Sequence, residues 1–142
     1  MVSDLLQRSG SKVSVKLKKH FPGGRLVGGK YQMASHTVTL YEEEIKRQCT
    51  RLFGSLDRLE EYTAVIFAHE LGHAEDPQLE DLSLLLDGEL TIQERNWTAL
   101  QIEENAWRYA EKLLADMDQA FLAKIITESL AAYREKVAGD IA

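Results

Sequence analysis

His69 and His73 are separated by three residues and enclose Glu70 in a His-Glu-x-x-His motif. Residues 62–68, immediately before the motif, are mostly apolar and predict a helix. On a helix, residues four positions apart lie on the same face, one turn from each other, so both imidazoles can point at one metal ion. Glu70 directly follows the first histidine and can reach a metal-bound water. The pattern is typical of the active site of a zinc-dependent peptidase.

Two features argue against a chance occurrence of the motif. Gly72 lies inside the predicted helix, where glycine costs about 1 kcal/mol relative to alanine, so it indicates that backbone or substrate approaches closely there. The two histidines also share an apolar stripe with Tyr62 and Ile66, where an unpaired imidazole is costly to bury. The alternative interpretation is a pair of hydrogen-bonded core histidines without a metal.

A catalytic zinc site usually has three protein ligands, so a third is expected outside the motif. The metzincin pattern is excluded, because it requires glycine and histidine where this chain has Asp76 and Leu79. Asp76 could itself be a ligand, although capping or support of the ligands is the simpler role. Glu103 is a carboxylate on the apolar face of the next long helix and needs a partner there. We expect Glu103 to be the third ligand of one Zn²⁺ ion, with Glu104 as the main alternative.

The residues around Glu103 support this assignment. Ala106 and Ala110 share its face of the helix and would let the helix approach the motif helix closely. Glu104 lies on a charged face and has the spacing of an exposed ion pair with Arg108.

In such a site Glu70 is the expected catalytic acid/base, which accepts a proton from water and passes it to the departing amine. A second donor to the developing oxyanion is usual, and the sequence does not single one out. Tyr31, His36 and Tyr109 are candidates, and a structural role is the simpler interpretation of each. Tyr31 and His36 also flank a predicted edge strand, which could bind substrate by strand addition.

Periodicity and capping residues predict the helices that position the site. The first of these helices starts near Glu42 and ends near Gly54. Asp57 and Glu60 have the spacing of a capping box that would open the motif helix. Pro77 limits the far end of that helix.

The helices after the motif are predicted in the same way. Residues 77–90 are partly apolar and predict a short helix or a wall of the cleft. Thr91 and Glu94 form a second capping box, which opens the long helix of the third ligand. A last helix is predicted over residues 119–137, ended by Gly139.

The N-terminal part of the chain has the pattern of strands and turns. Residues 13–17 and residues 37–40 alternate as half-buried strands do. Pro22-Gly23-Gly24 and Gly28-Gly29 predict turns on either side of Arg25-Leu26-Val27. We expect these segments to form a small, twisted, antiparallel sheet.

The predicted fold class is α+β, with a single metallopeptidase-like domain over residues 1–142. Residues 1–40 are expected to be sheet-rich after a short helix at residues 2–7. Residues 41–142 are expected to form a helical bundle that contains the motif helix and the third-ligand helix, a zincin-like arrangement. An apolar content of 44% and a charged content of 28% suit such a globular domain.

Charge and cysteine content exclude several function classes. A net charge of −6 argues against general nucleic-acid binding, so no nucleic-acid partner is expected. Cys49 is the only cysteine and cannot form an internal disulfide. With no secretory signal and no apolar run long enough for a membrane span, we expect a cytoplasmic protein without a membrane partner. The sequence does not indicate the oligomeric state.

Residues 68–73, Ala-His-Glu-Leu-Gly-His, and residues 103–110, Glu-x-x-Ala-x-x-Tyr-Ala, occur together in this chain. The pair resembles the motifs of the ImmA/IrrE family of metallopeptidases, a gluzincin-type group of bacteria and their mobile elements. The resemblance implies that the two motif histidines and Glu103 bind zinc and that Glu70 is catalytic. It also implies a regulatory protease that cleaves a repressor. Trp107 departs from the thermolysin-like pattern, which has aspartate four residues after the ligand glutamate.

The predicted function is therefore a zinc-dependent endopeptidase that hydrolyses a peptide bond in a specific protein or peptide, such as a regulator or repressor. The alternative is a catalytically inactive zinc-binding interaction module, or a mobile-element accessory protein that acts by binding. Glu70 favours hydrolysis, because a purely structural zinc site needs no base.

Overall fold

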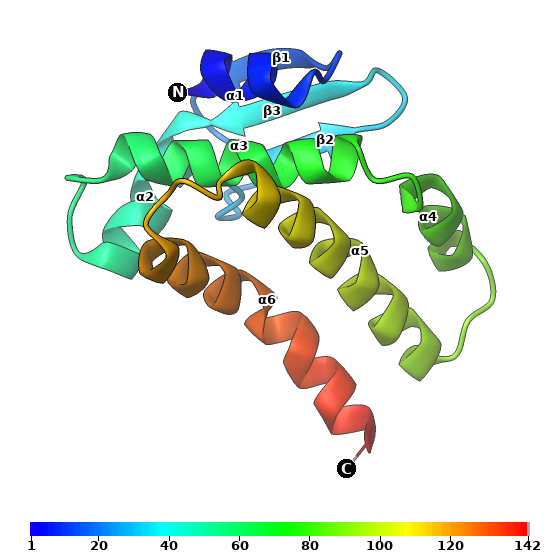
Figure 1. Ribbon diagram of the computed structural model, residues 1–142. Helices are drawn as coiled ribbons and strands as arrows, with labels where there is room; N and C mark the ends of the chain where they lie inside the picture. The colour runs from blue at the N-terminus through cyan, green and yellow to red at the C-terminus, as the bar shows by residue number, and fades with distance from the viewer. Residues whose placement is uncertain (142) are drawn as a thin grey trace.

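A three-stranded sheet and six helices make up the described part of the chain, residues 1–141 of a computed structural model (Figure 1). The fold class is α+β, as the sequence predicts. The elements are, in chain order, α1 (Val2–Ser9), β1 (Ser14–Lys18), β2 (Gly29–Gln32), β3 (Thr37–Tyr41), α2 (Glu42–Phe53), α3 (Leu59–Ala74), α4 (Leu79–Asp87), α5 (Ile92–Leu113) and α6 (Gln119–Ile141).

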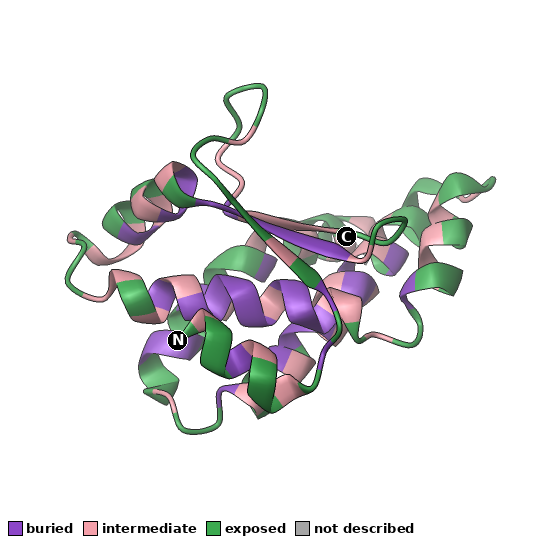
Figure 2. Cartoon of the chain, turned by 90° about the horizontal axis from the view of Figure 1, so that it is seen from above, coloured by how far each residue is buried: buried purple, intermediate pink, exposed green. Residues whose placement is uncertain are grey.

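The helix with the motif, α3, is the central element of the molecule. Its middle residues are apolar on every side, and such a helix is stable only when it is buried all round. Val65, Phe67 and Leu71 are fully buried, and Figure 2 shows α3 as the longest buried stretch of helix. It packs against α1, α2, α5 and the strands β2 and β3. The site residues on α3 are therefore held by contacts on several sides.

The sheet is mixed, so the prediction of an antiparallel sheet is wrong. β3 lies in the centre, with β1 parallel on one edge and β2 antiparallel on the other. The chain reverses between β1 and β2 and again between β2 and β3, which leaves β3 running in the direction of β1. Residues 19–28 carry the chain past the position of β3, so that β3 is inserted between the two earlier strands. Apolar alternation predicts that a segment is a strand but not which neighbour it pairs with.

The second predicted turn is also wrong. Gly29 is the first residue of β2, and Gly28 accepts a hydrogen bond from the amide of Tyr41 at 2.8 Å. The glycine pair therefore belongs to the ladder beside β3.

The predicted cap of α5 is confirmed. The Thr91 hydroxyl accepts a hydrogen bond from the amide of Glu94 at 3.1 Å, and the Glu94 carboxylate accepts one from the amide of Thr91 at 3.1 Å. These two bonds satisfy amides that have no partner inside the helix. The helix extends over 22 residues and places Glu103 near its middle.

The three other helix boundaries predicted from single residues differ in outcome. Gly54 ends α2 in the left-handed conformation, with φ of 77°, as predicted. Asp57 does not cap α3: the helix begins at Leu59 and no side chain bonds its first amides. Instead the amide of Asp57 donates to the Ser55 hydroxyl at 3.3 Å, which orders the preceding turn. Gly139 does not end α6, which continues to Ile141.

Residues 77–90 contain the short helix α4, Leu79–Asp87, between α3 and α5. Leu79 is buried at its start, whereas Leu84 and Leu85 are exposed. Of the helices within residues 1–141, none is long and apolar enough to cross a membrane.

Candidate metal centre

The two motif histidines face the same carboxylate across the contact between α3 and α5. Nε2 of His69 lies 3.1 Å from Oε1 of Glu103, and Nε2 of His73 lies 3.3 Å from Oε2 of the same residue. The structure therefore brings together the three residues that the sequence predicts as ligands. Glu103 has only 17% of its side chain exposed, so its charge is largely removed from water.

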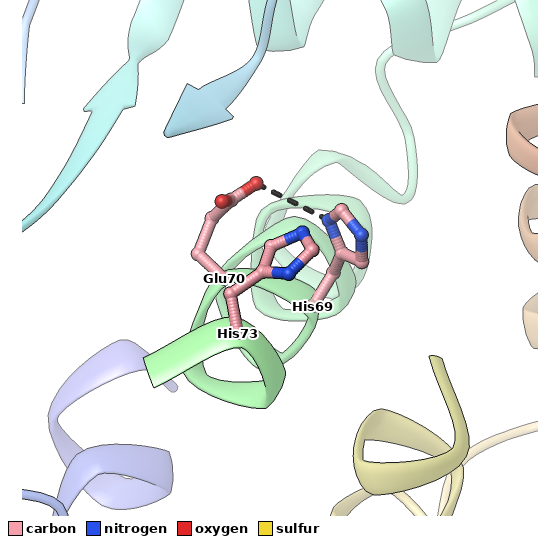
Figure 3. A group of neighbouring side chains, drawn as sticks. All are labelled: His69, Glu70 and His73. Carbon is pink, nitrogen blue, oxygen red and sulfur yellow. Dashed lines mark hydrogen bonds and ion pairs between the residues drawn. The ribbon is translucent and has the colours of Figure 1, made fainter. Parts of the chain in front are cut away.

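Glu70 extends the cluster on the other side of His69. Its Oε2 lies 3.2 Å from Nδ1 of His69, and Figure 3 shows this contact with His73 beside it. His69, Glu70 and His73 each offer a ligand atom within 4.8 Å of the others. Two imidazoles and two carboxylates thus meet in a small volume, and all but Glu103 come from two turns of α3.

Gly29 of β2 makes room for Glu70. A Cβ at Gly29 would lie 3.0 Å from Cγ and 3.3 Å from Oε2 of Glu70, and 3.2 Å from a methyl group of Ile66. These contacts are tighter than most real Cβ contacts, so a side chain at position 29 would require Glu70 and Ile66 to shift by a few tenths of an ångström. The absence of a side chain at Gly29 therefore lets the strand pass close to the side chain of Glu70 without displacing it.

The close approach of α3 and α5 depends on Gly72, as the sequence predicts. A Cβ at this position would collide with the backbone carbonyl oxygen of Ala106 and would lie 2.8 Å from its carbonyl carbon. Both obstructing atoms belong to the backbone, so no rotamer change can remove them. Ala106 and Ala110 are fully buried in the same contact. The absent side chain at Gly72 sets the spacing that brings Glu103 to the histidines.

An aromatic contact orients the first histidine. The Trp107 ring stacks on His69 with centroids 4.3 Å apart and an interplanar angle of 19°. Trp107, one turn after Glu103 on α5, therefore covers one face of the His69 imidazole. Among the described residues, Nδ1 of His73 and Nε1 of Trp107 are buried without a hydrogen-bond partner.

The electrostatics of the cluster follow from its opposite charges. Burial alone would lower the pKa of His69, but the carboxylates of Glu70 and Glu103 raise it to about 10. Burial alone would raise the pKa of Glu103, but hydrogen bonds from His69 and His73 and their charge hold it well below its usual range. In the metal-free protein the two carboxylates thus favour a protonated imidazole between them.

The residues fit a zinc ion on the chemistry of the donor set. Two imidazole nitrogens and one carboxylate are a common ligand set for catalytic zinc, which retains a fourth position for water. Both Nε2 atoms point at a single carboxylate, so three donor atoms already surround one region of space. A dication bound there would compensate the negative charge of Glu70 and Glu103, which a protonated His69 compensates in the metal-free protein.

A cavity of about 380 Å³ opens beside the cluster. Elements distant in sequence form its walls: β2, α3, α4, α5 and α6. The residues that line it are Gly29, Lys30, Tyr31, Met33, His69, Glu70, His73, Leu79, Ser83, Ile102, Glu103 and Tyr133. The cluster is therefore accessible to a ligand that enters between the sheet edge and the helices.

The alternative ligands lie outside the cluster. Glu104 is 3.7 Å from Arg134 of α6, which replaces the pair with Arg108 that its spacing predicted. Asp76 accepts hydrogen bonds from the amide of Gln78 at 2.9 Å and from the side-chain amide of Asn105 at 3.2 Å. Asp76 thus connects the turn before α4 to α5, which is the capping role expected for it.

The predicted oxyanion donors differ in position. Tyr31 lines the cavity, but its hydroxyl lies 2.8 Å from Nδ1 of His36. His36 is in the turn between β2 and β3, has φ of 48°, and is not a cavity residue. Tyr109 also lies outside the cavity. Tyr133 of α6 also lines the cavity. The sequence does not single it out, because the pattern of the last helix gives no sign of where that helix meets the site.

Comparison with models of protein families, with curated proteins and with solved structures finds no match to this chain. The assignment of a function therefore depends on the side-chain geometry and on the two sequence motifs.

Proposed function

We propose that this chain is a zinc-dependent peptidase in which His69, His73 and Glu103 bind one zinc ion and Glu70 is the catalytic acid/base. The observation that carries the proposal is the position of the two Nε2 atoms, 3.1 and 3.3 Å from the two oxygens of Glu103. A buried carboxylate shared by two imidazoles across a helix contact is the donor set of a catalytic zinc site.

The chemistry follows from the groups around the cavity. Zinc held by these ligands would lower the pKa of a water molecule to near neutrality and polarise a peptide carbonyl. Glu70 borders the same cavity and accepts the proton of the attacking water, then transfers it to the departing amine. Contact with β2 and burial of 95% of its surface keep the Glu70 side chain at the cavity wall.

The shape of the site favours an extended peptide as substrate. β2 pairs with β3 along one edge only, and Gly29, Lys30 and Tyr31 of this strand line the cavity. Backbone groups of an edge strand can pair with an incoming peptide, which places its carbonyl beside the cluster. A specific protein target, such as the repressor implied by the likeness to the ImmA/IrrE family, and a cytoplasmic location belong to this proposal.

Substitution of Glu70 by Gln tests the proposal. The variant keeps the shape of the side chain but removes the base, so we expect zinc binding to be retained and cleavage to be lost. Cleavage is measured by mass spectrometry on a peptide library made from a whole-cell extract, with zinc content measured on the same samples. Glu104→Gln is the matched control, since Glu104 pairs with Arg134 outside the cluster, and it should cleave as the unmodified chain does.

The alternative, a zinc-binding module without activity, makes the opposite prediction. If the unmodified zinc-loaded chain cleaves no member of the library, or if Glu70→Gln cleaves as well as it does, the peptidase assignment is wrong.

A further inference from the structure

The proposed reaction leaves one requirement unassigned. Attack on a peptide carbonyl places negative charge on its oxygen, and a fixed hydrogen-bond donor at that point accelerates the step. His69, His73 and Glu103 are occupied as ligands, and Glu70 is occupied with the proton. A donor must therefore come from another wall of the same cavity.

The tyrosines near the site differ in whether their hydroxyl is free. The Tyr31 hydroxyl is held by His36 at 2.8 Å. Tyr109 does not border the cavity. Tyr133 borders the cavity together with Glu70 and Glu103. Within residues 1–141, no hydrogen bond of the Tyr133 hydroxyl is found.

Tyr133 is also held in a defined position on α6. Leu130, almost one turn before it, is buried to 2% exposure in the core. Arg134, the next residue, lies 3.7 Å from Glu104 of α5. α6 packs along α5, the long helix that carries Glu103, and Tyr133 lies between these two positions. A phenol on such a helix keeps its place as charge develops in the cavity.

The electrostatic environment supports a donor role. Burial raises the pKa of Tyr133, and the charges of Glu103 and Glu70 raise it further. The phenol therefore stays protonated at neutral pH.

We propose that Tyr133 is a catalytic residue whose hydroxyl donates a hydrogen bond to the scissile carbonyl oxygen as that oxygen gains negative charge. The inference rests on the proposed peptidase function and adds a residue from α6 to a site otherwise built on α3 and α5. It also gives the C-terminal helix a role in the chemistry as well as in the core.

The test is the substitution Tyr133→Phe, which removes one oxygen from a half-buried side chain and leaves the ring. We expect kcat to fall by about 10²–10³-fold, the usual effect of losing one oxyanion donor, with little change in KM. Zinc content should remain that of the unmodified chain. Tyr109→Phe is the matched control, since this tyrosine lies outside the cavity, and its kcat should be unchanged.

A second probe separates binding of the transition state from binding of the peptide. A phosphonamidate analogue of the best-cleaved library peptide mimics the tetrahedral state. Tyr133→Phe should weaken binding of the analogue by the same factor as it lowers kcat. The uncleaved peptide should bind the double variant Glu70→Gln/Tyr133→Phe as tightly as it binds Glu70→Gln.

The outcomes separate this inference from the proposed function. If the unmodified chain cleaves and Tyr133→Phe keeps its rate, or if Tyr31→Phe causes the loss instead, the role of Tyr133 is refuted and the peptidase assignment stands. Loss of zinc from Tyr133→Phe would show a structural role and also refute it. An unmodified chain that cleaves nothing overturns both proposals.

Discussion

Replacement of Gly72 by Ala should destabilise the protein and weaken its metal site, although the same change usually stabilises a helix. Alanine is favoured over glycine inside helices by about 1 kcal/mol. Here the added methyl group would lie 2.8 Å from the carbonyl carbon of Ala106, whereas ordinary contact begins at 3.4 Å. The carbonyl oxygen of Ala106 lies closer still, so the two helices must separate by more than the roughly 0.6 Å that the contact with the carbon alone requires.

The cost can be stated from general values. Overpacking a tight contact costs about 1–3 kcal/mol, and a clash between two backbones belongs at the upper end. After the gain in helix propensity, we expect the free energy of unfolding to fall by about 2 kcal/mol. Glu103 lies one turn from Ala106, so a displacement of α5 away from α3 also moves Glu103 away from the two histidines. Since ligand distances in metal sites tolerate about 0.2 Å, zinc affinity should fall at least about tenfold.

Urea denaturation of the metal-free protein measures the first effect, and competition with a chelator measures the second. Gly139→Ala is the control, because the site is helical in α6 and a Cβ there meets nothing within 4 Å. Its stability should be unchanged or raised by up to about 1 kcal/mol. A Gly72→Ala protein as stable as the control, with unaltered zinc affinity, would refute the argument that this contact sets the ligand geometry.

Two further predictions concern the cap of α5 and the effect of pH. Thr91→Ala removes the bond to the Glu94 amide and should lower the free energy of unfolding in urea by about 1 kcal/mol. The control is Thr127→Ala, at an exposed position inside α6, which should cost less because Thr127 caps no helix; equal losses would contradict the capping assignment. In chelator, His69 has a pKa raised to about 10 when folded, above its ordinary value of 6.5, so its contribution to stability is complete below about pH 6.5 and is lost as the pH rises to about 10. Zinc requires the deprotonated imidazole, so the stabilisation by added zinc should instead grow with pH over this range. Denaturation curves from pH 6 to 10, compared with those of His69→Ala, check both slopes, and a zinc effect that shrinks with rising pH would contradict them.

The sequence predicts the cluster well because its main constraints are local. Spacing on one helix places His69 and His73 on a common face, and the carboxylate of Glu103 on an apolar face indicates a partner. Gly72 is identified in the same local way: glycine destabilises a helix relative to alanine, so its presence there indicates a close approach of another part of the chain. In each case the physical argument involves only neighbours within one or two turns.

The parts that the sequence does not predict depend on long-range packing. The alternation of apolar residues along β1 and β3 does not depend on whether the two strands pair directly. The sequence therefore does not predict the parallel pairing that makes the sheet mixed. Asp57 has the spacing of a cap, but it belongs to the turn ordered by Ser55, and α3 begins one residue later than predicted, at Leu59. Tyr133 lies on a stripe that is apolar elsewhere, and only the crossing of α6 over α5 shows that it reaches the cavity.

The most direct measurement is the zinc content of the purified chain after equilibration with buffered Zn²⁺. The account predicts one zinc per chain for the unmodified protein and for Glu104→Ala, and loss of zinc from His69→Ala, His73→Ala and Glu103→Ala. Full zinc content in all three ligand variants, or zinc loss from Glu104→Ala alone, would contradict the central claim that these two imidazoles and this carboxylate hold one ion.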